Sequence, residues 1–161
     1  MTTGDYEYLA EVWPNEKVSA PSALWRTGGD VPEYLSLIDW EWHAGAQEFT
    51  EYPAGTLVAI TAEDAQALQS DRQRFVRYWS YQIPNDESEP AKENRVYRRR
   101  SSPDKIVDEV FGPDNAWVAT PVIREFTVGS PADRPELVAI DQAAAEQLIQ
   151  QTRGITGATE L

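Results

Sequence analysis

The amino-acid sequence predicts an α+β fold built from two similar halves, each a mainly antiparallel sheet followed by a helix. Two observations lead to this prediction. Short segments of alternating or continuous apolar residues, bounded by Pro, Gly and Asn, occur along the 161-residue chain, as in proteins with many strands. The same segments also recur in the same order in the second half, which is the signature of an internal duplication.

The repeated segments are matched over most of the chain, and the spacing between partners grows from 70 to 80 residues. Each increase falls in a stretch rich in Pro, Gly or charged residues, where a loop can take an insertion. We therefore expect a first half over 1–72, a second half over 73–154 and a frayed tail over 155–161, packed as one body about a pseudo-two-fold axis. The alternative is that similar local propensities arose independently. The matched pairs are Tyr8 with Tyr78, 14–16 with 84–86, 24–26 with 96–98, Trp40 with Trp117, 48–50 with 125–127, and 57–60 with 137–140.

In the first half, the residue pattern predicts five strands and one helix. The opening strand should place Tyr6, Tyr8, Ala10 and Val12 on one face and end at Pro14. The last strand is a short apolar run typical of a central strand covered on both faces. A helix should follow at once, because Thr61 and Asp64 have the spacing of a capping box and Ala65 and Leu68 form an apolar stripe. The expected strands are 6–13, 23–27, 38–43, one containing 48–50, and 57–60.

The second half is expected to repeat this order with one added helix. Ser102 and Pro103 resemble an N-cap and a first helical position, which predicts a helix from Asp104 to Val110. The closing helix should begin at Asp141, a side chain suited to capping, and end at Gly154. The expected strands are 75–83, 95–99, one containing 125–127, and 137–140.

Composition excludes several classes of protein. The chain has no cysteine, so disulfides and thiolate metal sites are absent, and a reducing, cytoplasmic setting is expected. With 27 acidic and 14 basic residues the net charge is −13, which argues against a nucleic-acid-binding protein. No signal peptide is expected, and no apolar run reaches the roughly 20 residues of a membrane helix. Neither nucleic acid nor a membrane is therefore an expected partner, and both a monomer and a homodimer fit the sequence.

Sequence motifs of catalysis are missing. The chain has neither a phosphate-binding glycine loop nor a nucleophile elbow around a serine, so we expect no catalytic residue and no cofactor. The one histidine, His43, lies in the expected strand over 38–43, where Asp39, Glu41 and His43 would share one face. Such a trio could bind a divalent metal ion or act in acid-base chemistry. The other interpretation is a solvated polar face opposite two core tryptophans.

The basic residues concentrate in one run, Arg98-Arg99-Arg100. On a strand, Arg98 and Arg100 point to one side of the sheet and Arg99 to the other, so the three do not form a single patch. One hypothesis is a contact with an anion or an RNA phosphate. The alternative pairs these side chains with the acidic first half, or leaves them on an edge strand where charge discourages further pairing.

The acidic excess falls almost entirely in the first half. Residues 1–71 carry 13 acidic and 2 basic side chains, whereas residues 72–161 carry 14 and 12. A strongly acidic face suits docking to a basic partner, because complementary charge speeds encounter and selects the partner. The sequence thus favours a non-catalytic binding protein, such as an inhibitor or immunity-type protein that blocks a basic toxin or nuclease. The candidate partner-binding residues are acids, or aromatic residues with weak core signals: Tyr34, Asp39, Glu41, Trp42, Glu51, Tyr52 and Tyr81.

Two other functions fit the same residues. The chain could bind a small molecule or a metal ion in a cleft between the halves, with Asp39, Glu41 and His43 or the aromatic side chains as the site. It could also be a soluble domain whose acidity serves only solubility.

Overall fold

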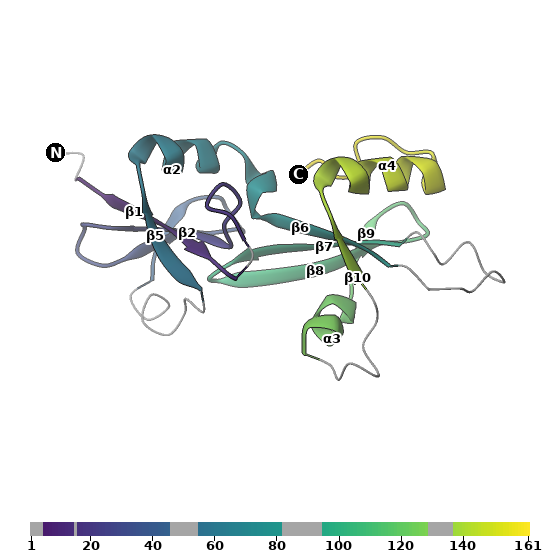
Figure 1. Cartoon of the computed structure of the whole chain (residues 1–161), viewed down its shortest axis with the longest axis horizontal. Helices are drawn as coiled ribbons and strands as arrows, with labels where there is room; N and C mark the ends of the chain where they lie inside the picture. Colours follow the sequence, from purple (N-terminus) through teal and green to yellow (C-terminus); the bar gives the residue numbers. More distant parts are fainter. Residues whose placement is uncertain (1–4, 15, 46–54, 82–94, 129–136) are drawn as a thin grey trace. The chain divides into compact units, whose positions relative to one another are not determined.

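The computed structural model describes residues 5–14, 16–45, 55–81, 95–128 and 137–161 (Figure 1). The chain forms two units, each with a five-stranded antiparallel sheet, and three α-helices lie within the described residues. The first unit comprises residues 1–75 and 101–106, and the second comprises residues 76–100 and 107–161. The predicted α+β class is therefore confirmed for the described part of the chain. No helix in that part has the length and apolar character needed to cross a membrane.

The first unit holds five strands, a helix and a 3₁₀ turn. These are β1 (Glu7–Val12), β2 (Ala23–Thr27), β3 (Glu33–Leu35), β4 (Trp42–Ala44), β5 (Thr56–Ile60), α2 (Ala62–Gln69) and η1 (Arg72–Phe75). The sheet has the order β4-β3-β2-β1-β5. Thr61 caps α2 as predicted, because its side-chain oxygen accepts a hydrogen bond from the backbone nitrogen of Asp64 at 3.0 Å.

The second unit holds five strands and two helices. These are β6 (Val76–Tyr81), β7 (Arg95–Ser102), β8 (Lys105–Phe111), β9 (Trp117–Ala119), α3 (Val122–Val128), β10 (Leu137–Ile140) and α4 (Gln142–Arg153). The sheet has the order β10-β6-β7-β8-β9, and the turn of the β7–β8 hairpin belongs to the first unit. Both predicted ends of α4 are confirmed. The Asp141 side chain accepts from the backbone nitrogen of Ala144 at 2.7 Å, and Gly154 ends the helix with a left-handed φ of 70°.

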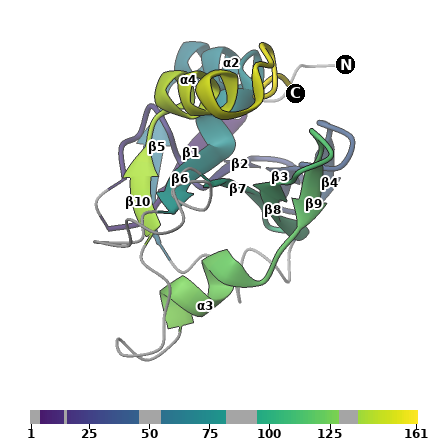
Figure 2. The ribbon, with the colours of Figure 1, turned by 90° about the vertical axis from the view of Figure 1, so that its right-hand side faces the viewer.

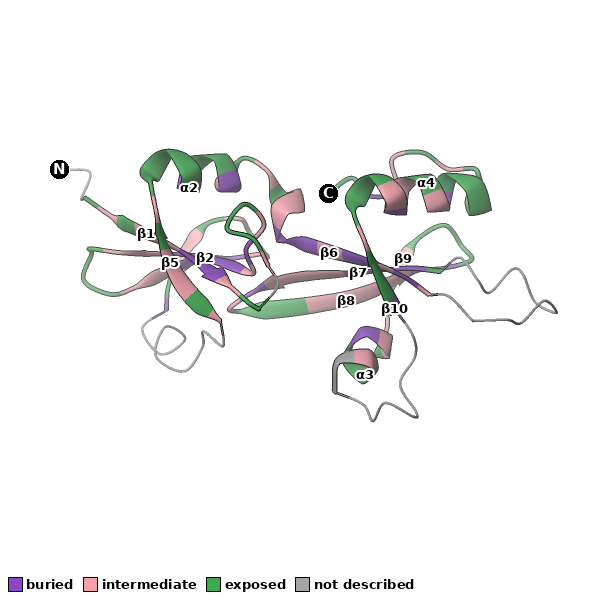
Figure 3. Cartoon of the chain, viewed as in Figure 1, coloured by how far each residue is buried: buried purple, intermediate pink, exposed green. Residues whose placement is uncertain are grey.

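Side-chain alternation along the strands gives each sheet two apolar faces, and the buried residues gather on inner strands such as β2 and β6 (Figure 3). In the first unit, Leu24 packs with Ala65 and Leu68 of α2, whereas Trp25 and Tyr34 form a separate cluster. Leu24 and Trp25 are neighbours in β2 and point to opposite faces of the sheet. The two clusters therefore cover both faces of this strand.

The second sheet lies between its two helices, since α4 and α3 are on opposite sides of it (Figures 1 and 2). Tyr78 of β6 packs in one cluster with Ile149 of α4. Tyr97 of β7 packs in another cluster with Ile123 of α3. Ile123 and Ile149 are almost completely buried, so both helices are held by apolar packing.

The two sheets have the same strand order when β1 to β5 are matched in turn with β6 to β10. Their registers also correspond. In the first sheet Tyr8 lies opposite both Arg26 and Ile60, and in the second sheet Tyr78 lies opposite Arg98 and Ile140. These residues have the spacings of 70, 72 and 80 found by matching the sequence to itself.

One of the sequence matches changes in the structure. Trp117 begins β9 and lies opposite Phe111, and its counterpart by register is Trp42, which begins β4 and lies opposite Leu35. The sequence matching had paired Trp117 with Trp40. Trp40 instead lies in the turn before β4, where it has a positive φ of 59°.

The helix predicted from Asp104 to Val110 is wrong, because these residues lie in the turn before β8 and in β8 itself. Ser102 and Pro103 belong to a hairpin turn and do not cap a helix. The branched residues Ile106, Val107 and Val110 favour a strand, and pairing with β7 and β9 satisfies the backbone.

The strand predicted around residues 125–127 is also wrong, since these residues lie in α3. Its counterpart in the first half, 48–50, lies outside the described residues. The two LVAI segments do form strands, but neither is central as expected. β5 pairs with β1 and β10 pairs with β6, and each occupies the end of its sheet.

The tail over 155–161 is packed, where fraying was expected. Thr159 is buried, and Ile155 and Ala158 pack against the cluster around α4. Trp117 Nε1 donates a hydrogen bond to the backbone oxygen of Ala158 at 2.8 Å, and the Glu146 carboxylate accepts one from the backbone nitrogen of Gly157. The tail therefore completes the core of the second unit.

Loss of the cap of α4 gives a first testable prediction. Asp141→Ala should lower the free energy of unfolding by about 1 kcal/mol, because the amide of Ala144 loses its acceptor. Gln147→Ala, an exposed change within the same helix, should alter it by less than about 0.5 kcal/mol. Equilibrium urea denaturation measures both, and equal effects of the two changes would contradict the capping role.

Candidate functional site

The candidate site lies in the β3–β4 hairpin of the first unit, which contains five of the residues selected from the sequence. The predicted strand over 38–43 is wrong: residues 37–41 form the turn and bend of the hairpin, and only Trp42 and His43 belong to β4. Asp39, Glu41 and His43 therefore do not alternate on one strand face.

The turn is held by hydrogen bonds at almost every backbone nitrogen. Ser36 N donates to Glu41 O and Trp40 N donates to Ser36 O, both at 2.9 Å. Ile38 N donates to Ser36 Oγ at 3.1 Å, and Glu41 N donates to Asp39 Oδ1 at 3.0 Å. These bonds stabilise the left-handed conformation of Trp40, whose indole nitrogen also donates to the backbone oxygen of Gln69 at 2.6 Å.

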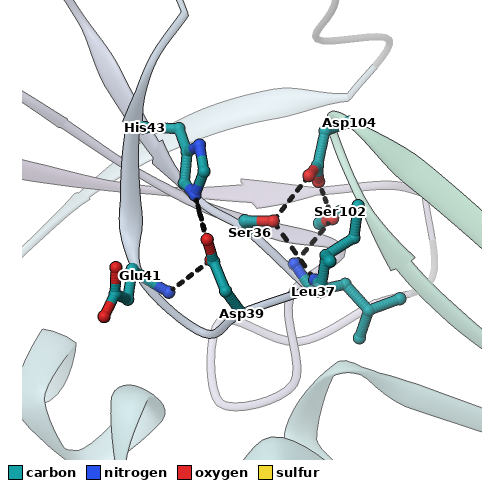
Figure 4. A network of polar contacts seen from close by, with 8 residues as sticks. Ser36, Leu37, Asp39, Glu41, His43, Ser102 and Asp104 are labelled. Carbon is teal, nitrogen blue, oxygen red and sulfur yellow. Dashed lines mark hydrogen bonds and ion pairs between the residues drawn. The ribbon is translucent and has the colours of Figure 1, made fainter.

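A second set of contacts joins this turn to the turn of the β7–β8 hairpin within the first unit (Figure 4). The buried Ser36 Oγ donates to Asp104 Oδ2 at 2.5 Å. Leu37 N donates to Ser102 Oγ at 2.9 Å, and Ser102 Oγ donates to the other oxygen of Asp104. One carboxylate thus organises two turns that are 65 to 68 residues apart in the sequence.

His43 and Asp39 form a polar pair at the surface of the hairpin. His43 Nε2 lies 2.9 and 2.7 Å from the two carboxylate oxygens of Asp39, and both side chains are about two-fifths exposed, at 41% and 42%. The imidazole ring stacks on Tyr34, with ring centroids 5.9 Å apart and an angle of 17°. Tyr34 is itself buried against Trp25, so the pair rests on the core.

The electrostatics of the pair favour an ionised Asp39. Desolvation acts to raise the pKa of this carboxyl, but the hydrogen bond from His43, the amide of Glu41 and the attraction of His43 together outweigh it. The net effect lowers the pKa of Asp39 below its ordinary value. Asp39 therefore carries its negative charge throughout the physiological pH range.

The expected metal trio is not assembled in this hairpin. The carboxylate of Glu41 points away from the Asp39–His43 pair, which Glu41 contacts only through its backbone nitrogen (Figure 4). Within the described residues, no group of three or more His, Cys, Asp and Glu side chains could hold a metal ion. The geometry leaves a two-residue acid–imidazole pair.

Trp42 points to the opposite face of the hairpin and takes part in a core contact. The Arg26 guanidinium lies over both the Trp42 ring at 4.3 Å and the Tyr6 ring at 4.2 Å, and Arg26 Nε contacts Glu33 Oε2 at 2.6 Å. The corresponding residues of the second unit repeat this arrangement. Arg98 lies over Trp117 at 4.0 Å and contacts Glu109 at 3.0 Å.

The remaining candidate residues are not brought into the hairpin. Glu51 and Tyr52 lie outside the described residues. Tyr81 belongs to β6 of the second unit, where it packs against the cluster of Tyr97 and Ile123. Tyr34 does belong to the hairpin, in β3, but its side chain is buried. Of the residues selected from the sequence, Asp39, Glu41 and His43 are those that the hairpin presents at the surface.

The arginine run Arg98-Arg99-Arg100 is paired within its own unit. Neither the expected edge strand nor the expected pairing with the acidic first half is found. β7 lies in the middle of its sheet and not at an edge. Arg98 and Arg100 contact Glu109 at 3.0 and 2.8 Å, and Arg99 contacts Asp108 at 2.7 Å, so their partners are on β8 and not in the acidic first half. These ion pairs also leave the run poorly suited to bind an external phosphate.

The sequence did not indicate Ile38, Ser102 or Asp104 as residues of the candidate site. Ser102-Pro103-Asp104 between two β-rich segments is a hairpin signal, and it could have been recognised from the branched residues that follow. The contact with Ser36 has no local signal, because it joins distant parts of the chain.

Comparison of the chain with protein-family models, curated proteins and solved structures gives no match.

The Asp39–His43 contact gives a second prediction. In His43→Ala the pKa of Asp39 should rise towards its ordinary value near 3.8, because the hydrogen bond and the attraction from His43 are gone. Since the pKa is lowered in the native fold, the contact stabilises the fold above that ordinary value, and the stabilisation is lost as the pH falls through the lowered pKa. Carboxyl carbon chemical shifts measured against pH report this directly.

Glu41→Gln is the matched control for that titration. It retains the backbone amide that donates to Asp39, so the pKa of Asp39 should stay below its ordinary value. An Asp39 carboxyl that titrates identically in the native protein and in His43→Ala would refute the assigned contact.

Proposed function

We propose that this chain is a non-catalytic binding protein that docks a basic protein partner through the acidic surface of its first unit. An inhibitor or immunity-type protein that blocks a basic toxin or nuclease is the role that suits this chemistry best. The observation that carries the proposal is a difference in charge between the two units: the first exposes eight of its described carboxylates, whereas the arginine run of the second is paired with carboxylates of its own sheet.

The exposed acids of the first unit are spread over its strands, turns and helix. Two of them, Glu63 and Asp64, lie in the first turn of α2, and Asp39 and Glu41 lie in the β3–β4 turn. A surface of one sign attracts oppositely charged proteins and orients them before contact. The exposed carboxylates among the described residues of this unit are Asp5, Glu7, Asp30, Asp39, Glu41, Glu63, Asp64 and Asp104.

The arginine run of the second unit supports the same proposal, because its charges are used within the unit. The side chains of Arg98, Arg99 and Arg100 are 7%, 25% and 28% exposed, and each contacts a carboxylate of β8. They therefore neutralise Asp108 and Glu109 within their own sheet and contribute little positive charge to the surface.

We also propose that the two units arose by tandem duplication. Their identical strand orders, their corresponding registers and the repeated Arg–Glu–Trp contact support this origin. The pair Tyr34 and His43 of the first sheet occupies the register of Val110 and Val118 in the second. The polar hairpin is thus a feature of one unit, as expected when one copy acquires a binding role.

Salt dependence of association tests the proposed function. We would measure association rates with a panel of small basic ribonucleases and toxins by stopped-flow fluorescence. For a true partner the rate should fall about tenfold or more between low and high ionic strength. Glu63→Lys with Asp64→Lys should slow association, whereas Asp114→Lys in the second unit should have a smaller effect. Salt-independent rates, or the absence of a stoichiometric complex with every member of the panel, would contradict the proposal.

A further inference from the structure

The first unit exposes two large apolar side chains close in sequence to the hydrogen-bonded residues Ser36 and Asp104. Ile38 is 68% exposed and Ile106 is 51% exposed. Ile38 follows Ser36 by two residues and Ile106 follows Asp104 by two residues, and Ser36 and Asp104 are joined by a hydrogen bond. Ile38 has the largest exposed fraction among the exposed large hydrophobic residues of the described chain. Exposure of this kind costs solvation free energy that binding to a partner would recover.

The turn that carries Ile38 is already ordered. Backbone nitrogens of Leu37 and Ile38 donate to the hydroxyls of Ser102 and Ser36, and Glu41 N donates to Asp39. Binding through such a turn loses little further conformational freedom, because the backbone is fixed beforehand.

Three exposed carboxylates lie near these two isoleucines in the sequence: Asp39 and Glu41 follow Ile38, and Asp104 precedes Ile106, from which the exposed Lys105 separates it. We call these five residues, Ile38, Asp39, Glu41, Asp104 and Ile106, the acidic turn surface. Apolar side chains flanked by carboxylates complement a segment in which arginine or lysine alternates with apolar residues.

The second unit lacks this combination in the corresponding turn. The segment between β8 and β9 runs Gly112-Pro113-Asp114-Asn115-Ala116, which is one residue shorter than the segment between β3 and β4 and has no large apolar side chain. A hairpin therefore forms at the corresponding place without an exposed isoleucine. Ile38 is not needed to build the turn.

We propose that the acidic turn surface is where the first unit docks its partner, and that it takes an arginine-rich segment carrying apolar side chains, with Ile38 as the apolar anchor. This inference rests on the proposed function and assigns it a location and a partner chemistry. The carboxylates would pair with the basic side chains, and Ile38 and Ile106 would pack against the apolar ones.

Two synthetic peptides of equal length and charge test the inference, one alternating arginine with leucine and the other alternating arginine with serine. Isothermal titration with the full-length protein should show tighter binding of the arginine–leucine peptide. Ile38→Ser should weaken that binding about tenfold and remove most of the difference between the peptides. Val18→Ser, at another exposed apolar residue of the first unit, should change it less than about twofold.

Two double variants test the contribution of the carboxylates to peptide binding. Asp39→Asn with Glu41→Gln should weaken both peptides more than Glu63→Gln with Asp64→Asn, although each pair removes two charges. Equal weakening by the two pairs, together with no effect of Ile38→Ser, would reject this location while leaving a role for the first unit's charge. No binding of either peptide to the native protein would overturn this location, whereas the proposed function is decided by the association rates with the panel of basic proteins. Circular dichroism establishes that each variant is folded.

Discussion

Replacing Glu109 by alanine is expected to lower the free energy of unfolding by about 3 to 5 kcal/mol, the usual cost of removing one member of a buried ion pair. Glu109 Oε1 contacts both Arg98 Nε and Arg100, and the Arg98 side chain is only 7% exposed. Burial lowers the pKa of the Arg98 guanidinium, and the attraction of Glu109 is the main effect that opposes it. Without Glu109, the second unit would retain a buried cation over the Trp117 ring and no carboxylate beside it.

Two controls separate the loss of the ion pair from other effects. Arg98→Met combined with Glu109→Leu removes both charges and should recover much of the stability lost in Glu109→Ala. Asp71→Ala breaks the exposed contact with Arg74, whose side chains are 41% to 48% exposed, and should cost less than about 1 kcal/mol. A Glu109→Ala variant as stable as Asp71→Ala, measured by urea denaturation, would show that the buried pair is not required.

The second large effect is expected at Trp25, which has no exposed surface and packs with Ala23 and Tyr34. Trp25→Ala should lower the free energy of unfolding by about 3 to 5 kcal/mol, because an indole-sized cavity opens in the first unit. The stacked Tyr34 and His43 should lose their support as well, so the hairpin turn should exchange its amide hydrogens faster.

Trp13→Ala is the matched control for Trp25→Ala. Trp13 is 39% exposed, and its loss should lower the free energy of unfolding less than the loss of the fully buried Trp25. Hydrogen exchange followed by mass spectrometry compares the two variants segment by segment. Unchanged protection of β2 and β3 in Trp25→Ala would argue against a core role for this residue.

The parts of the fold that the sequence predicts are those specified by local chemistry. Thr61, Asp141 and Gly154 act at the helix ends as expected, because capping depends on a few neighbouring backbone groups. Ser102 shows the limit of such reasoning. The same residue types that cap helices also stabilise turns, and the sheet formed by β7 and β8 decides between the two structures.

The sequence indicated residues of the candidate site correctly, but the geometry predicted for them was wrong. Asp39 and His43 were expected to meet as alternating residues of a strand, but they meet because a turn folds residues four apart onto each other. The sequence indicated the right residue types and not the geometry. Ser36 and Asp104 could not be paired in this way, since 68 residues separate them and only tertiary structure joins them.

The return of residues 101–106 to the first unit also has a consequence for synthesis of the chain on the ribosome. The partners of Ser36 and Leu37, namely Asp104 and Ser102, are made about 30 residues after Phe75, the last residue of the unit's main segment. At bacterial or eukaryotic elongation rates this is a delay of a few seconds, roughly 30 residues at 5 to 20 per second. The emerging amino-terminal half should therefore expose an unlatched β3–β4 turn until the β7–β8 hairpin turn has left the exit tunnel.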